Sequence, residues 1–163
     1  ITQATPLRLA AAGEPVSLAP LFWGGVPGSL GETCAPLILL GGLYLLWRKA
    51  ANFRIVLGAA GAMIVLQTLF GWAGLPRAIP PLQALAGGSF LFGLFFFATE
   101  PVSAAQTQPG RWIYGVLIGA LTVLIRVFSA WAEGMMFAIL LANTFAPLLD
   151  HVVRSLSPPA QKS

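Results

Sequence analysis

The sequence predicts an all-α polytopic membrane protein with about five transmembrane helices and one re-entrant or broken segment. The chain has 163 residues, of which 57% are hydrophobic and only 9% are charged, and its mean hydropathy is +0.82. A soluble domain carries about 25% charged residues, so too few charges are present to cover a globule in water. The apolar runs are long and turn residues separate them, which favours helices over a β-barrel.

The apolar runs define five candidate spans. Several are shorter than the roughly 20 residues of a simple span, so we expect uncertain boundaries and some broken helices. Ahead of them, residues 18–31 are apolar but interrupted by prolines and glycines, which predicts a re-entrant or interfacial segment packed on protein. The five spans are expected at about residues 33–47, 53–72, 81–98, 112–128 and 134–149.

The chain divides into four regions on this pattern. Residues 1–17 form a polar leading segment, 18–31 the re-entrant or interfacial segment, 32–150 a five-helix membrane domain and 151–163 a tail. With five spans, one side collects six basic residues: Arg48, Lys49, Arg54, Arg111, Arg154 and Lys162. The other side has only Arg8 and Arg77. Because basic residues concentrate in cytoplasmic loops, we expect a cytoplasmic C-terminus and residues 1–31 on the periplasmic side of a bacterial inner membrane.

The composition argues against several classes of function. The net charge of +4 is scattered beside apolar runs, so it indicates the lipid bilayer and not nucleic acid as the partner. Cys34 is the single cysteine, which excludes an internal disulfide and a multi-cysteine metal site within the chain. His151 is also alone and follows the last span, where an interfacial position is expected. We therefore predict no metal site and no catalytic side chain.

Charged residues inside or beside spans are costly and indicate function by default. Each of them here also has a structural interpretation. Glu32 follows Ser29 by three residues, which is the spacing of a helix capping box, and Gly28 allows a tight turn beside it. Glu100 ends the third span, where it fits either a cap or an ion or proton site. Asp150 fits either an interfacial charge or the mouth of a cation path.

Arg126 lies late in the fourth span, where its side chain either snorkels to the interface or pairs with Glu133, and we favour a structural ion pair. Two glycine pairs, at residues 41–42 and 87–88, lie inside spans. Close helix packing is their expected role. A flat cofactor against bare backbone is the alternative.

Six segments of the chain resemble, in this order, the C-terminal half of one family. That family comprises the RnfD subunit of the Rnf electron-transport complex and the NqrB subunit of the Na+-translocating NADH:quinone reductase. The segments are TQATPL, PGSLGET, LLGGLYLLWRK, FFATEPVSA, GRWIYGVLIGALTVLIR and EGMMFAILLANTFAPLLD. The resemblance implies one repeat of a urea-transporter-like fold. It covers nearly the whole chain, and the LLGGLYLLW stretch favours the Rnf type.

The resemblance also implies a flavoprotein. The family attaches FMN through a phosphoester to a threonine in an S/T-x-A-T motif, which corresponds here to Thr2–Thr5, so Thr5 is the expected attachment site. Thr2, Gly28, Ser29 and Glu32 are expected cofactor-binding neighbours. A separate flavin transferase recognises an aspartate upstream of the motif. That residue does not precede Thr2 here, so we expect the chain to be a piece of a longer protein.

The function implied by the resemblance is a membrane component of a redox-driven Na+ or H+ translocating complex of the Rnf type. Electrons would pass through the covalent FMN, because a flavin exchanges single electrons while the protein supplies position and electrostatics. Partners would be the other membrane, flavin and iron–sulfur subunits, and the resemblance also allows riboflavin in the complex. The expected ion path uses Glu100, Asp150 and Glu133. Glu100 stands where the family usually has aspartate, and Cys34 where it has serine.

Three other roles remain open. The first is the NqrB subunit of the Na+-translocating NADH:quinone reductase. The second is a urea-transporter-like solute channel, which would need no flavin on a hydroxyl. A purely structural membrane protein would leave electron transfer unchanged when Thr5 is replaced by alanine.

Overall fold

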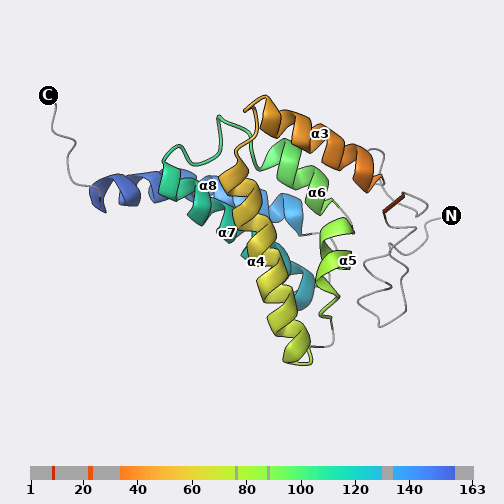
Figure 1. The fold of residues 1–163 in the computed structure, drawn as a ribbon. Helices are drawn as coiled ribbons and strands as arrows, with labels where there is room; N and C mark the ends of the chain where they lie inside the picture. Colours follow the sequence, from red (N-terminus) through yellow and green to blue (C-terminus); the bar gives the residue numbers. More distant parts are fainter. Residues whose placement is uncertain are drawn as a thin grey trace, which may run out of the picture.

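The computed structural model describes residues 9, 22–23, 34–75, 77–87, 89–129 and 134–156, and all regular structure in these residues is helical (Figure 1). The elements are α3 (Ala35–Trp47), α4 (Phe53–Trp72), α5 (Pro81–Ala86), α6 (Phe90–Phe92), the π-helix η1 (Gly93–Phe97), α7 (Gln108–Phe128) and α8 (Met135–Leu156). Three of them, α4, α7 and α8, are long and apolar enough to cross a membrane. The chain is therefore a multi-pass membrane protein, although the expected count of five spans is not confirmed.

Helices α4 and α7 form the centre of the bundle and run parallel to each other. A methyl group on Gly115 would lie 2.5 Å from the carbonyl oxygen of Ile55, so the two backbones are nearly in contact. Further along, the rings of Phe70 and Phe128 meet edge to face with centroids 5.9 Å apart. Small residues allow such close approach, which increases van der Waals contact where the hydrophobic effect is weak. These two contacts set the register of the pair, with residue 55 beside 115 and residue 70 beside 128.

Helix α8 returns antiparallel to α7 after a short connection. The Tyr114 hydroxyl, from a fully buried side chain on α7, donates a hydrogen bond to Oδ1 of Asn143 on α8. Pro147 lies inside α8 and cannot donate to the carbonyl of Asn143, four residues earlier. Even so, α8 continues to Leu156, beyond the end at residue 149 that hydropathy predicts.

The third expected span is not one helix. It consists of α5, an interruption at Gly87 with an extended backbone (φ −89°, ψ 141°), and then α6 with η1. Figure 1 shows these pieces on one flank of α4, with α3 packed over α6. Gly42 of α3 lies against the ring of Phe95, where an added methyl group would approach Cδ1 to 2.5 Å. The ring of Phe95 therefore covers the bare backbone at Gly42, as close helix packing predicts, and it leaves no room for a flat cofactor at this glycine.

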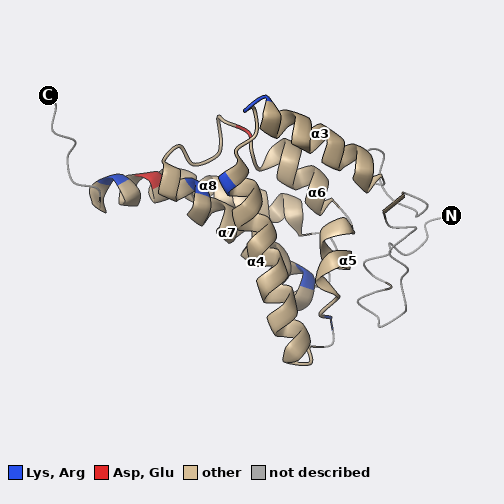
Figure 2. Cartoon of the chain, in the orientation of Figure 1, with Lys and Arg blue, Asp and Glu red and all other residues tan. Residues whose placement is uncertain are grey.

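The charges are segregated along the bundle (Figure 2). Because α4 and α7 are parallel and α8 is antiparallel, the start of α4, the start of α7 and the end of α8 share one end. Among the described residues, this end has the basic side chains Arg48, Lys49, Arg54, Arg111 and Arg154, while Arg77 lies at the opposite end and donates to the Ser129 carbonyl oxygen (2.7 Å). These described residues are therefore grouped as the sequence predicts.

Candidate functional site

Most of the expected site residues lie outside the part of the chain that the structure describes. These are the proposed flavin neighbours Thr2, Thr5, Gly28, Ser29 and Glu32, together with Glu133. Two expected ion-path residues, Glu100 and Asp150, are described. They lie at the same, basic end of the bundle, because Asp150 binds the start of α7 and Ser103, the partner of Glu100, lines the same cavity as Asp150.

The carboxylate of Asp150 joins α8 to the start of α7. Its Oδ2 accepts a hydrogen bond from the backbone N–H of Gln106 (2.7 Å), and its Oδ1 accepts from the N–H (2.9 Å) and the hydroxyl (2.6 Å) of Thr107. Thr107 is the N-cap of α7, and its hydroxyl oxygen in turn accepts from the N–H of Gly110 (3.2 Å). A carboxylate at a helix N-terminus also meets the positive end of the helix dipole. Asp150 is thus a buried capping group supplied by another helix.

Gly110 allows this arrangement. A methyl group added at Gly110 would lie 2.8 Å from Oδ1 of Asp150, closer than a carbon atom and an oxygen atom can approach without a shift. The fourth expected span starts near residue 112, whereas α7 starts at Gln108, so the prediction does not include the N-cap Thr107. The signal that marks it in the sequence is Thr107 two residues before Pro109, because threonine at the N-cap and proline in the first turn are typical of a helix start.

Glu100 is exposed in the turn that follows η1. One of its carboxylate oxygens accepts a hydrogen bond from the Ser103 hydroxyl (3.0 Å). Ser103 is followed by a short loop to Gln106 and Thr107, the residues that bind Asp150. The two acidic residues are therefore linked through one loop, residues 100–107.

A cavity of about 430 Å³ opens between this loop and α8. Polar and apolar groups both line it: Val102, Ser103, Ala104, Gln106, Ala146, Pro147, Asp150, His151 and Arg154. The α8 side brings Pro147 together with one carboxylate, one imidazole and one guanidinium. Among the described residues, no group of three His, Cys, Asp or Glu side chains could hold a metal ion.

A second polar site lies toward the opposite end of the bundle. Arg126 of α7 is buried, and its guanidinium donates to the carbonyl oxygens of Ala84 (2.7 Å) and Gly87 (3.4 Å). Because the side chain points inward, the snorkelling alternative is wrong. The expected pairing with Glu133 falls outside the described residues.

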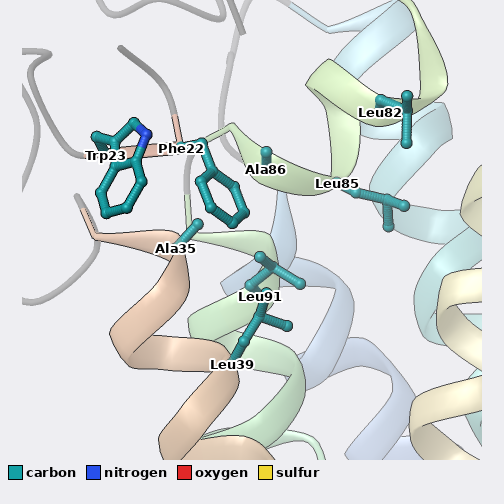
Figure 3. Close-up of a pocket in the computed structure, with 8 residues that line it drawn as sticks. All are labelled: Phe22, Trp23, Ala35, Leu39, Leu82, Leu85, Ala86 and Leu91. Atoms are coloured by element: carbon teal, nitrogen blue, oxygen red, sulfur yellow. The ribbon is translucent and has the colours of Figure 1, made fainter. Parts of the chain in front are cut away.

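An entirely different pocket lies beside α5 (Figure 3). It has a volume of about 450 Å³, and its walls are almost wholly apolar: Phe22, Trp23, Ala35, Leu39, Leu82, Leu85, Ala86 and Leu91. The rings of Phe22 and Trp23 meet edge to face with centroids 5.9 Å apart. These two residues belong to the expected re-entrant segment, 18–31, and they lie next to α3, α5 and α6. The rest of that segment is outside the described residues.

Comparison with known proteins gives consistent relatives over nearly the whole chain. The chain is 46% identical to the NqrB subunit of the Na(+)-translocating NADH-quinone reductase of Klebsiella pneumoniae over 158 residues, which covers 94% of this chain and 38% of that protein. It is 48% identical to the same protein of Ectopseudomonas mendocina over 162 residues, 92% of this chain and 40% of the relative. The chain thus spans about two fifths of the length of these curated relatives.

A family model also matches nearly the whole chain. It matches residues 1–157, which include all the described helices as well as the segment that carries Thr2 and Thr5. The buried cap at Asp150, the broken third span and the basic end of the bundle thus all lie within the matched region. The chain belongs to the NQR2, RnfD, RnfE family.

Proposed function

We propose that this chain is part of the NqrB-type membrane subunit of a redox-driven, Na+-translocating NADH:quinone reductase. The single observation that carries this proposal is the identity of 46–48% to NqrB proteins over more than nine tenths of the chain. The relatives favour the quinone reductase over the Rnf reading that the LLGGLYLLW stretch suggests. The broken third span is compatible with a urea-transporter-like repeat, in which discontinuous helices are usual.

The electron donor and acceptor separate the two family members. If the chain works in the quinone reductase, membranes containing the full complex oxidise NADH with quinone as acceptor, and this activity rises with Na+. An Rnf-type protein would instead exchange electrons between ferredoxin and NAD+. Na+-independent quinone reduction by a complex that contains this chain would contradict the assignment.

The proposal includes FMN bound covalently to Thr5. A phosphoester on a side-chain hydroxyl holds a flavin permanently, and FMN supplies one-electron chemistry when bound. The protein's own residues would position it: Thr5 as the anchor, with Thr2, Gly28, Ser29 and Glu32 as neighbours. The helix directions support a position on the outer side. Helix α3 ends at the basic end of the bundle, so the chain enters α3 from the opposite end.

Replacement of Thr5 by alanine tests the FMN proposal. In the full complex made with its flavin transferase, we expect the Thr5→Ala protein to lose its ultraviolet fluorescence on a denaturing gel, because no hydroxyl remains to form the phosphoester. Thr2→Ala is the matched control and is expected to keep the fluorescence. Fluorescence that remains in the Thr5→Ala protein, or a wild-type protein without fluorescence, would contradict the assignment of covalent FMN to Thr5.

For ion movement, we propose that the basic end faces the cytoplasm and that Glu100 and Asp150 lie on the route of the cation, with Glu133 as a further acidic group on it. The polar cavity between loop 100–107 and α8 supports this proposal, because it contains the Asp150 carboxylate and lies beside Ser103, which binds Glu100. Glu100 is exposed and free to adapt, whereas three hydrogen bonds hold Asp150. Glu100 is therefore the better candidate for direct contact with an entering ion.

A further inference from the structure

The break between α5 and α6 exposes backbone oxygens inside a membrane protein. Helix α5 ends at Ala86, and the extended backbone at Gly87 prevents the helix from continuing to α6. Carbonyl groups freed in this way have no water to bind in the hydrocarbon region, so protein groups must satisfy them. The oxygens also lie at the C-terminal end of a helix, where the peptide dipoles give a partial negative charge.

One buried guanidinium donates hydrogen bonds both to the last turn of α5 and to the break that follows it. Arg126 donates to the Ala84 oxygen in the last turn of α5 and to the Gly87 oxygen in the break itself, at 2.7 and 3.4 Å. Its Cζ also lies 5.8 Å from the centroid of the Phe90 ring, the first residue of α6, within reach of a cation–π interaction. The side chain is only 6% exposed.

A second buried polar group lies at the same depth. Gln67 on α4 is 1% exposed, and neither its amide nitrogen nor its amide oxygen has a hydrogen-bond partner in the described part of the chain. The register of α4 on α7 places Gln67 level with Arg126. An unpaired buried amide is costly and calls for an explanation.

We propose that the break is a monovalent-cation site that the chain fills with its own guanidinium. Unwound carbonyls and the C-terminal ends of half-helices coordinate small cations in transporters. Here the carbonyl oxygens of Ala84 and Gly87 are the ligands. The amide oxygen of Gln67 makes no hydrogen bond to the guanidinium, and it is the further ligand that a cation in place of Arg126 would recruit. Arg126 occupies the site in place of a cation from solution, and it thereby closes the break to Na+.

Removal and chemical replacement of the guanidinium test this inference. In the full complex, Arg126→Ala is expected to lower the thermal unfolding midpoint of this protein. Millimolar methylguanidinium should raise that midpoint again, and Na+ should raise it more than choline does at equal ionic strength. The matched control is Arg77→Ala, because Arg77 also donates to a carbonyl oxygen (Ser129, 2.7 Å) but is exposed. Methylguanidinium should not change the midpoint of Arg77→Ala, and Na+ should raise it no more than it raises the wild-type midpoint.

An Arg126→Ala midpoint that equals the wild type, or that no added cation restores, would overturn the proposal. If Arg126→Ala does not assemble, the thermal unfolding midpoints of Arg126→Lys and Arg126→Gln are compared to test the proposal. Lysine keeps the charge and glutamine keeps a neutral donor, so a cation site predicts that Arg126→Lys unfolds at the higher temperature. The reverse order would show that the break needs only a hydrogen-bond donor.

Gln67→Leu tests the third oxygen. In the Arg126→Ala background, we expect Gln67→Leu to weaken the stabilisation by methylguanidinium, and unchanged stabilisation would remove Gln67 from the site. All these measurements report thermal unfolding and not electron transfer. Their failure would therefore leave the proposed flavin function untouched, and loss of that function would not affect them.

Discussion

Individual residues of this protein have roles that their immediate sequence does not show. The sequence predicts Asp150 to be an interfacial charge or the mouth of a cation path, and the structure shows it as the cap of another helix. Its partners Gln106 and Thr107 lie more than 40 positions earlier in the chain. Hydropathy and spacing report only what is near in sequence, so no local pattern could identify this contact.

Asp150→Asn tests the capping role. Asparagine has one acceptor oxygen in place of two, so the N–H groups of Gln106 and Thr107 cannot both keep their bonds. Hydrogen bonds to charged groups contribute about 1.5–3 kcal/mol, and we expect a loss of that order in local stability. Hydrogen–deuterium exchange of the peptide covering residues 104–112 should accelerate correspondingly.

Glu100→Gln is the control for this prediction. Glu100 lies on the same loop, but it is exposed, and its carboxylate accepts a hydrogen bond from the nearby Ser103 hydroxyl and not from a distant helix. A surface substitution of this kind changes stability by about 0.5 kcal/mol or less. Equal acceleration of exchange in both variants would contradict the capping role of Asp150.

At the scale of helices, the pattern of hydropathy predicts the bounds of an element correctly where that element is long and uniformly apolar. The second span is expected at residues 53–72, and α4 occupies Phe53–Trp72 with Asn52 as its N-cap. The fourth and fifth expected spans are in the right places but too short, because polar and proline-containing turns extend α7 and α8. The third is wrong as a single helix, since Gly87 and the inward guanidinium of Arg126 stabilise a break.

The contact between α4 and α7 gives an element-scale prediction. Gly115→Ala should destabilise the pair by about 1–3 kcal/mol, because added atoms in a well-packed contact force the backbone to shift. The new methyl group would meet the carbonyl oxygen of Ile55 at 2.5 Å. The thermal unfolding midpoint of the purified complex measures the effect.

Gly61→Ala on α4 is the matched control, because an added methyl group there meets nothing within 4 Å. Alanine is a better helix former than glycine by about 1 kcal/mol, so this variant should be neutral or slightly stabilising. If Gly61→Ala and Gly115→Ala lower the midpoint equally, backbone crowding between α4 and α7 is not the cause.

At the scale of the whole molecule, the direction of the bundle in the membrane follows from the segregation of charge. Basic residues gather at one end in the described chain, and the positive-inside rule predicts that this end faces the cytoplasm. Single cysteines introduced at Val102 and Arg77, with Cys34 replaced by alanine, test this orientation. Val102 lies at the basic end and is 86% exposed.

We expect a membrane-impermeant maleimide to label Val102→Cys only in inside-out vesicles and Arg77→Cys only in right-side-out cells. The Cys34→Ala protein without a new cysteine is the control for background labelling. The reversed pattern would place residues 1–31, and with them the proposed flavin segment, on the cytoplasmic side.

The amino-acid sequence alone is enough to establish the membrane class, the positions of the long helices, the grouping of the basic residues, and the resemblance that the family match confirms. These properties depend on composition and short-range periodicity, which are local. The packed helices are needed to show that Asp150 caps α7, that Arg126 satisfies the break in the third span, and that Gln67 is buried without a partner among the described residues. The physical reason is that polar groups in a membrane protein need partners from distant helices, and the choice of partner depends on how the helices pack.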